Sequence, residues 1–205
     1  MKKAVILANG EFPKNIKLLK EAEFLICCDG AINNLLKTTI KPDLIIGDLD
    51  SINNKLKLQF SNIIVKIPDQ NTNDLTKAIN WCVKNNISSV KIIGATGKRE
   101  DHSIANIALL TKYIRLLDVQ IITDYGIFIP IVRTTKFSSF AGQQVSIFSL
   151  DNELKISSEN LKYPLRNLQL KTWWMGTLNE STNDNFTISF NNKDASVIVY
   201  KTNND

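Results

Sequence analysis

The chain of 205 residues has little cysteine and histidine and no long hydrophobic run. Its three cysteines, Cys27, Cys28 and Cys82, form no Cys-x-x-Cys motif, so neither a disulfide framework nor a zinc knuckle is indicated. Reduced, buried thiols in a cytoplasmic protein are expected instead. The only histidine, His102, makes a histidine-based metal site or a Ser-His-Asp triad hard to build. No apolar stretch approaches the roughly 20 residues of a transmembrane helix, and the N-terminal segment lacks a signal-peptide cleavage site.

The charge balance is mildly basic and does not identify a partner. The formal net charge is +5, with 22% charged and 43% hydrophobic residues, which is the balance of a soluble globular chain. The lysines are scattered rather than massed, so the basic excess alone indicates neither nucleic acid nor a membrane surface.

The order of apolar and amphipathic segments predicts two domains. Short apolar runs that predict buried strands alternate with helical patterns up to about residue 123. This part is expected to form an α/β domain with a mostly parallel, Rossmann-like sheet and right-handed crossovers. From residue 124 onward, short strand patterns and polar turns predict a small, antiparallel, all-β sandwich-like domain. The predicted strands of the first part are 4–7, 23–28, 43–46, 63–67, 90–93 and 119–123, and its helices are 74–84 and 103–117.

Polar motifs directly follow the apolar runs of the first part. They are Asn9-Gly10, Asp29-Gly30, Gly47–Ser51, Asp69–Asp74 and Gly94–His102. The carboxyl ends of parallel strands share one edge of a sheet, and ligands bind in the crevice there. The motifs are therefore expected to lie around one crevice.

Four aspartates of these motifs, Asp29, Asp48, Asp50 and Asp74, are predicted to converge. Clustered carboxylates repel one another unless a cation neutralises them. Oxygen ligands without thiolates or several histidines favour Mg²⁺. A magnesium ion held by carboxylates usually accompanies a phosphate-bearing substrate, so this is the site class that the sequence predicts.

Single residues of these motifs also have purely structural interpretations. Asp74 is equally well a first-turn carboxylate that the helix dipole favours, with Thr72 or Asn73 as the cap. His102 lies near a helix start with Asn106 on the same face, and a hydrogen-bonded structural histidine is favoured over a general base.

Two familiar phosphate-binding motifs are absent. The segment GATGK lacks the P-loop spacing, and no G-x-G-x-x-G follows the first strand. Lys98 and Arg99, beside two glycines, still offer donors for a phosphate, although such a pair is more often a solvated loop.

Taken together, the motifs resemble those of the thiamine pyrophosphokinase family. The segment Pro42–Ser51 matches its GDxDS signature, and Cys28–Asn33 (CDGAIN) resembles its DGGAN segment. Asp69–Ala78 resembles D-Q-x-x-[TN]-D-x-x-K-A, and Gly94–Asn106 resembles G-A-x-G-x-R-x-D-H-x-x-x-N. Nearer the C-terminus, Leu178 stands where the family commonly has serine.

The resemblance implies an enzymatic reaction, separate roles for the two domains and a homodimer. ATP and thiamine would give thiamine diphosphate and AMP, with Mg²⁺ as cofactor. Residues 1–123 would be the catalytic domain that binds ATP and magnesium. Residues 124–205 would contribute to the thiamine site and to a homodimer.

The resemblance also implies roles for individual residues. Which carboxylate accepts the hydroxyl proton is left open, and the aromatic side chains Trp173, Trp174 and Tyr163 are candidates for the cationic thiazolium or for core packing. The catalytic residues would be Asp48, Asp50, Asp74 and Asp101, and the metal ligands Asp29, Asp48, Asp50 and Asp74. The ATP-binding residues would be Asp29, Gly30, Asn33, Gln70, Thr72, Asn73, Lys98, Arg99, His102 and Asn106. The thiamine-binding residues would be Trp174, Thr177 and Asn179.

Two alternatives from other classes stay open at this point. Asp48-x-Asp50-Ser51 after an apolar strand resembles the nucleophile motif of haloacid-dehalogenase-type phosphatases, in which Asp48 would be phosphorylated. A non-catalytic nucleotide sensor or a basic nucleic-acid module is the other alternative. Carboxylates at the edge where a nucleic acid needs positive charge argue against the nucleic-acid module, so neither nucleic acid nor membrane is expected as a partner.

Overall fold

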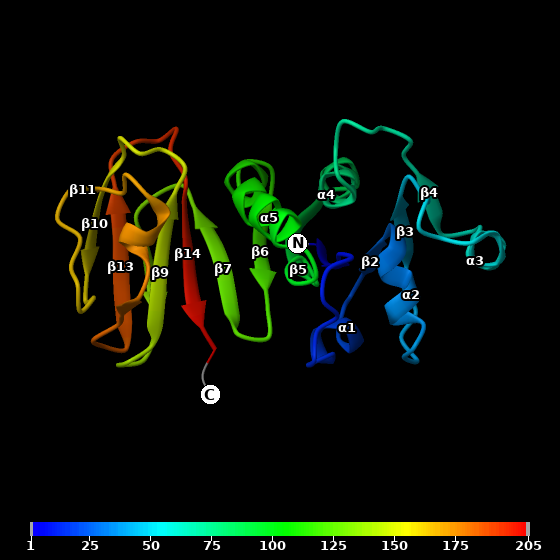
Figure 1. The fold of residues 1–205 in the computed structure, drawn as a ribbon, viewed down its shortest axis with the longest axis horizontal. Coiled ribbons are helices and arrows are strands. Elements are labelled where there is room, and N and C mark those ends of the chain that lie inside the picture. Colours follow the sequence, from blue (N-terminus) through cyan, green and yellow to red (C-terminus); the bar gives the residue numbers. More distant parts are fainter. Residues whose placement is uncertain (1, 204–205) are drawn as a thin grey trace. The chain divides into compact units, whose positions relative to one another are not determined.

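The computed structural model describes residues 2–203 and divides into two compact units (Figure 1). The first unit runs to residue 109 and includes residues 116–124. The second comprises residues 110–115 and the chain from residue 125 onward. Among the helices of residues 2–203, none has the length and apolar character needed to cross a bilayer.

The first unit is built on a six-stranded parallel sheet, which confirms the predicted α/β class. The strand order is β6-β5-β1-β2-β3-β4, and every pairing is parallel. The apolar runs form these strands because both faces of a parallel sheet are covered; β2 and β3 are buried along their whole length. The chain moves from β1 outward to β4 and then returns to pair β5 with the other side of β1, which is a topological switch point. The strands are β1 (Lys2–Leu7), β2 (Leu25–Cys28), β3 (Leu44–Gly47), β4 (Ile64–Lys66), β5 (Ile87–Ile93) and β6 (Asp118–Ile122).

Helix α4 (Asp74–Lys84) has the predicted bounds, and its apolar face is buried as its helical period indicates, except that Val83 is 38% exposed. Leu75, Ala78 and Cys82 lie on that face. The cap is Asn73, whose side-chain oxygen accepts the backbone N–H of Thr76 at 2.9 Å. The shorter helices are α1 (Lys17–Lys20), α2 (Ile32–Leu35), which follows the 3₁₀ turn η1 (Asp29–Ala31), and α3 (Asn54–Gln59).

Helix α5 begins and ends earlier than predicted. It spans Glu100–Tyr113 rather than 103–117. Glu100 and Asp101 occupy its first turn, where the positive end of the helix dipole favours carboxylates. The helical period of 103–117 predicts a buried face that includes Ile104, but Ile104 is 52% exposed, and the buried residues of the helix are Leu110 and Tyr113.

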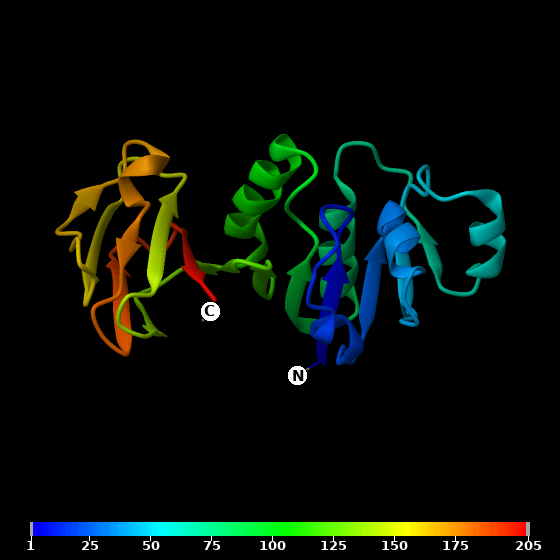
Figure 2. The ribbon, with the colours of Figure 1, turned by 60° about the horizontal axis from the view of Figure 1, so that its bottom comes forward.

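The second unit consists of two antiparallel sheets, as the strand patterns predicted. One has the order β12-β9-β14-β7 and the other β11-β10-β13-β8. Burial alternates along β9 and β13, which are yellow-green and orange in Figure 2, and buried side chains of both strands belong to one apolar core. Phe137 and Phe186 stack in this core with ring centroids 4.9 Å apart. The strands are β7 (Gly126–Ile131), β8 (Thr135–Ser138), β9 (Gln144–Ser149), β10 (Lys155–Glu159), β11 (Leu168–Gln169), β12 (Asn179–Glu180), β13 (Asn185–Phe190) and β14 (Val197–Thr202), and a 3₁₀ turn η2 covers Trp173–Gly176.

The cap of α4 generates a stability prediction. Asn73→Ala removes the acceptor for the Thr76 N–H and is expected to lower the free energy of unfolding of the first unit by about 1 kcal/mol. Urea unfolding followed by Trp81 fluorescence, with Trp173→Phe and Trp174→Phe as the background, reports on this unit alone. Asn80→Ala, at an exposed position of the same helix, is the control and should change little. Equal effects of the two substitutions would contradict the capping role.

The three cysteines generate a second prediction. Cys27, Cys28 and Cys82 are free and buried. Burial raises the pKa of all three thiols, that of Cys82 to about 12. A thiol-specific disulfide reagent at about pH 7.5 is expected to titrate none of them in the native protein and three after unfolding in guanidinium, because only the accessible thiolate reacts. Rapid labelling of the folded chain would show that the core opens locally.

Candidate active site

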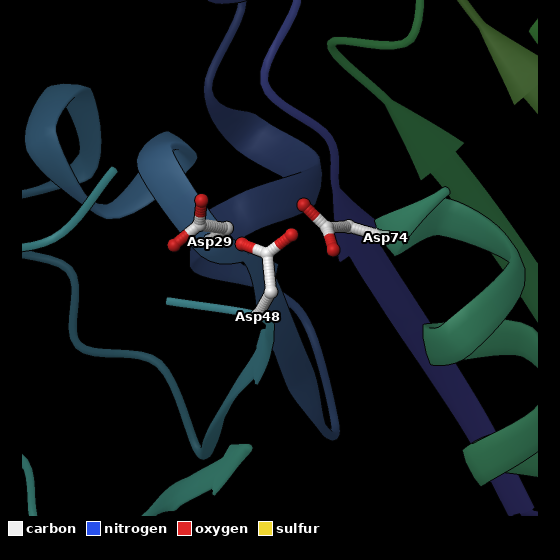
Figure 3. Close-up of side chains that lie close together, drawn as sticks. All are labelled: Asp29, Asp48 and Asp74. Carbon is white, nitrogen blue, oxygen red and sulfur yellow. The ribbon is translucent and has the colours of Figure 1, made fainter. Parts of the chain in front are cut away.

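Three carboxylates meet at the carboxyl edge of the first unit's sheet (Figure 3). Asp29 follows β2, Asp48 follows β3, and Asp74 is the first residue of α4. One carboxylate oxygen from each residue lies within 4.8 Å of the others. The predicted convergence of these three aspartates is thus present, since parallel strands bring their following loops to one edge.

Asp29 is the most buried of the three and is incompletely paired. Its side chain is 4% exposed, and Oδ2 accepts the backbone N–H of Ser51 at 3.2 Å. Oδ1 is buried without a hydrogen-bond partner among the described groups. An unpaired buried carboxylate oxygen is costly, and a bound cation is one way to satisfy it.

Asp48 and Asp74 have carboxyl groups with opposite pKa shifts. Asp48 Oδ1 accepts the Asp50 backbone N–H at 3.1 Å, and Oδ2 lies 3.4 Å from Gln70 Nε2. The Asp50 N–H is the main reason that the pKa of Asp48 lies below its usual value, with Lys77 and Gln70 acting in the same direction. Burial raises the pKa of Asp74, although Lys77 opposes this shift.

Lys77 belongs to this cluster and was not among the predicted site residues. Its side chain is 3% exposed, and Nζ lies 3.0 Å from Asp74 Oδ1 and 3.7 Å from Asp48 Oδ2. Burial alone would lower the pKa of Lys77, but the neighbouring carboxylates raise it above its usual value. The available sequence signal was its place in the segment Asp69–Ala78, where Lys77 is the lysine of the pattern D-Q-x-x-[TN]-D-x-x-K-A, three residues after Asp74.

Gly47 permits the close approach of these groups. A Cβ atom at this position would lie 2.8 Å from Asp29 Cβ and 3.1 Å from Asp74 Oδ1. Any side chain here would therefore push the Asp29 and Asp74 carboxylates apart. The glycine before Asp48 acts as a spacer that keeps the cluster compact.

The cluster lies in a cleft of about 520 Å³ within the first unit. Besides the three carboxylates and Lys77, the cleft contains Asn9 of the Asn9-Gly10 motif, which was expected around the crevice without a specific role. The Asn9 backbone carbonyl accepts the Lys98 ammonium at 3.2 Å. Seven further residues predicted to bind ATP also line the cleft: Gln70, Thr72, Asn73, Lys98, Arg99, His102 and Asn106.

The neutral lining residues are held by one another. Asn106 donates to the Ala95 carbonyl at 2.8 Å and accepts from Asn73 Nδ2 at 3.3 Å. Thr72 donates to Asp69. His102 is exposed and lines the cleft.

Four residues predicted for the site are not gathered into the cleft. The Asp50 side chain is exposed and lies outside the three-carboxylate group, because its backbone rather than its carboxylate faces Asp48. Gly30 packs against Asn9, and Asn33 donates to the Ser51 carbonyl, so both shape the loops. Asp101 is exposed and forms a 2.5 Å ion pair with Arg99, which is the main reason that its pKa is lowered.

In the second unit, the residues predicted to bind thiamine differ in availability. Trp174 is 75% exposed, and Thr177 donates its hydroxyl to the Trp174 carbonyl at 2.8 Å. Asn179 is buried, and its amide bonds both the N–H and the carbonyl of Tyr163. These bonds hold the amide in the protein fold, so in this structure it is not free to bind a ligand.

The parallel sheet, its switch point and the acidic cleft at its carboxyl edge place the chain among α/β enzymes that act on phosphate-bearing substrates. A family model described as "Thiamin pyrophosphokinase, catalytic domain" matches residues 16–123. A second, described as "Thiamin pyrophosphokinase, substrate-binding domain", matches residues 126–200. The chain belongs to the thiamin pyrophosphokinase family. The phosphatase and non-catalytic sensor alternatives are therefore set aside.

The chain is also similar to individual proteins that are named as thiamin or thiamine pyrophosphokinases. The chain is similar to thiamin pyrophosphokinase 1 of Caenorhabditis elegans, at 25% identity over 198 residues that cover 89% of this chain and 80% of that protein. It is 30% identical to thiamine pyrophosphokinase 1 of rice over 152 residues, which cover 62% of this chain and 58% of that protein. The crystal structure of thiamine pyrophosphokinase from Bacillus subtilis shares the fold over 100% of both chains, with a TM-score of 0.83 and 22% identity.

The lowered pKa of Asp48 generates a prediction on acid stability. A carboxyl group with a lower pKa in the folded than in the unfolded chain stabilises the fold above its usual pKa of about 3.9. That stabilisation is lost as the pH falls through the lowered folded value. Asp48→Asn is therefore expected to reduce the drop in unfolding free energy between about pH 7 and about pH 3, measured by urea unfolding. Asp194→Asn, in an exposed loop, should leave the drop unchanged.

Proposed function

We propose that this chain transfers the pyrophosphoryl group of ATP to the hydroxyl of thiamine, giving thiamine diphosphate and AMP. The observation that carries this proposal is the three-carboxylate cleft in a chain that matches both domains of the family. In this reaction the thiamine oxygen forms a bond to the β-phosphorus, and the bond between that phosphorus and the α–β bridging oxygen breaks. Such a transfer depends on positioning and on neutralising charge.

The donor set of the cleft fits Mg²⁺. Asp29, Asp48 and Asp74 offer hard oxygen ligands, and the unpartnered Oδ1 of Asp29 supports a cation there. When bound, magnesium would supply positive charge against the triphosphate oxygens. We assign the metal to these three residues; Asp50, predicted as a fourth ligand, has its carboxylate outside their group.

Residues of the cleft wall are suited to hold the triphosphate. Lys98, Arg99 and His102 line the cleft and are exposed, so their nitrogens are accessible to an anion. The Arg99 guanidinium can bind phosphate through two nitrogens once it leaves Asp101. Gln70 and Asn106 add neutral donors on the same wall.

The acceptor of the hydroxyl proton is better sought among the cleft carboxylates than at Asp101. Asp101 does not line the cleft, and its pKa is lowered mainly by Arg99, so it is a weak base.

The second unit is proposed to contribute the thiamine site. The exposed indole of Trp174 offers a face for the thiazolium cation, and Thr177 lies in the same turn. Asn179 would take part only by giving up its bonds to Tyr163, so we assign it the positioning of that loop. We also propose the predicted division of roles between residues 1–123 and 124–205, a homodimer and a cytoplasmic location.

The function is tested by product analysis. Incubation with ATP, Mg²⁺ and thiamine is expected to give equimolar AMP and thiamine diphosphate, separated by ion-pair chromatography. Asp48→Asn removes a ligand charge at the centre of the cluster and is expected to lower turnover at least about 100-fold. Asp194→Asn, in an exposed loop of the second unit, is the matched control and should keep full activity.

Two results would contradict the proposal. Release of inorganic phosphate from small phosphoesters, with no thiamine diphosphate, would return the assignment to a phosphatase. Equal loss of activity in Asp48→Asn and Asp194→Asn would show that the effect is not specific to the carboxylate cluster.

A further inference from the structure

Lys77 is the one cation in direct contact with the described carboxylate cluster. It lies on the buried side of α4 with 3% of its side chain exposed. Its ammonium reaches two of the three carboxylates, at 3.0 Å from Asp74 and 3.7 Å from Asp48. A lysine is rarely this buried without charged partners, so its position depends on the cluster.

The distribution of these contacts is uneven. Lys77 pairs with Asp48 and Asp74, whereas Asp29 receives only the Ser51 N–H and keeps Oδ1 unpartnered. The lysine thus neutralises one side of the cluster and leaves the other side available for a second cation. The two cations would share the cluster rather than compete for one position.

The formal charges of the group support this division. Three ionised carboxylates carry a charge of −3, and the Lys77 ammonium reduces it to −2. A divalent ion brings the group to zero. Without the lysine, a trivalent ion would be needed to bring the net charge of the group to zero.

We propose that Lys77 is a permanent counter-ion that sets the charge of the metal site so that it favours a divalent over a trivalent cation. It is a positioning residue, because it acts through Asp48 and Asp74 rather than on the substrate. The proposal rests on the metal-dependent function proposed above. It concerns the ligand-free protein, so its test uses neither ATP nor thiamine.

The test is the ratio of Tb³⁺ to Mn²⁺ affinity. Protein loaded with Mn²⁺ is titrated with Tb³⁺, and released Mn²⁺ is followed by electron paramagnetic resonance. Lys77→Met removes the charge at similar length and is expected to raise the Tb³⁺ to Mn²⁺ affinity ratio at least about tenfold, because the lysine repels the additional charge of the trivalent ion at close range. Any loss of carboxylate alignment affects both ions, so the ratio isolates the charge.

Matched variants separate this role from packing. Lys77→Arg keeps the charge and should keep the ratio within about threefold of the original. Lys84→Met removes an exposed lysine from the same helix and should leave the ratio unchanged. Because the titration starts from metal-loaded protein, a Lys77→Met chain that folds only with metal can still be measured, and Lys77→Gln serves as the second neutral variant.

The outcomes are distinct. An unchanged ratio in both neutral Lys77 variants would overturn the proposal, as would an equal rise in Lys84→Met. A raised ratio in a chain that makes no thiamine diphosphate would support the counter-ion role and reject the proposed function. Normal formation of thiamine diphosphate with an unchanged Tb³⁺ to Mn²⁺ affinity ratio would support the proposed function and reject the counter-ion role.

Discussion

Mutual repulsion among Asp29, Asp48 and Asp74 is the constraint on which the first unit's cleft depends. Carboxylate oxygens within 4.8 Å of one another separate unless their charge is compensated. The fold compensates it with the backbone N–H groups of Asp50 and Ser51 and with the buried Lys77 ammonium. These groups sit on loops and on a helix whose positions the parallel strands fix. The parallel strands therefore form the core and also hold the three carboxylates close together against their repulsion.

Much of the fold could be predicted from the sequence because its signals are local. Apolar runs predicted the parallel strands, and short strand patterns separated by polar turns predicted the antiparallel strands of the second unit. Helix α4 was predicted from its apolar stripe and its Asn73 cap. The start of α5 was missed by three residues because the first-turn acids Glu100 and Asp101 read equally well as part of a polar loop. Its buried face was partly wrong because the helical periodicity is weak, and Ile104 is exposed while Leu110 and Tyr113 are buried.

The candidate site could be predicted only as far as topology determines it. The rule that ligands bind at the carboxyl ends of parallel strands brought Asp29, Asp48 and Asp74 together from distant segments. It could not separate Asp48 from Asp50, since side-chain direction within a turn depends on backbone angles that residue types do not fix. Lys77 was missed because a lysine next to an apolar stripe usually extends to solvent, and only the neighbouring carboxylates keep it buried.

The cleft holds its cations in two different ways, and the difference bears on the proposed reaction. Arg99 is paired with Asp101 at the exposed surface, where water and salt weaken an ion pair. A phosphate group entering the cleft can therefore take this guanidinium at little cost. Lys77 is paired below the surface, where removing a partner would leave a buried charge uncompensated. In the proposed reaction, the exposed cation would thus change partners with the substrate, whereas the buried one would stay with the carboxylates and set the charge that a bound metal meets.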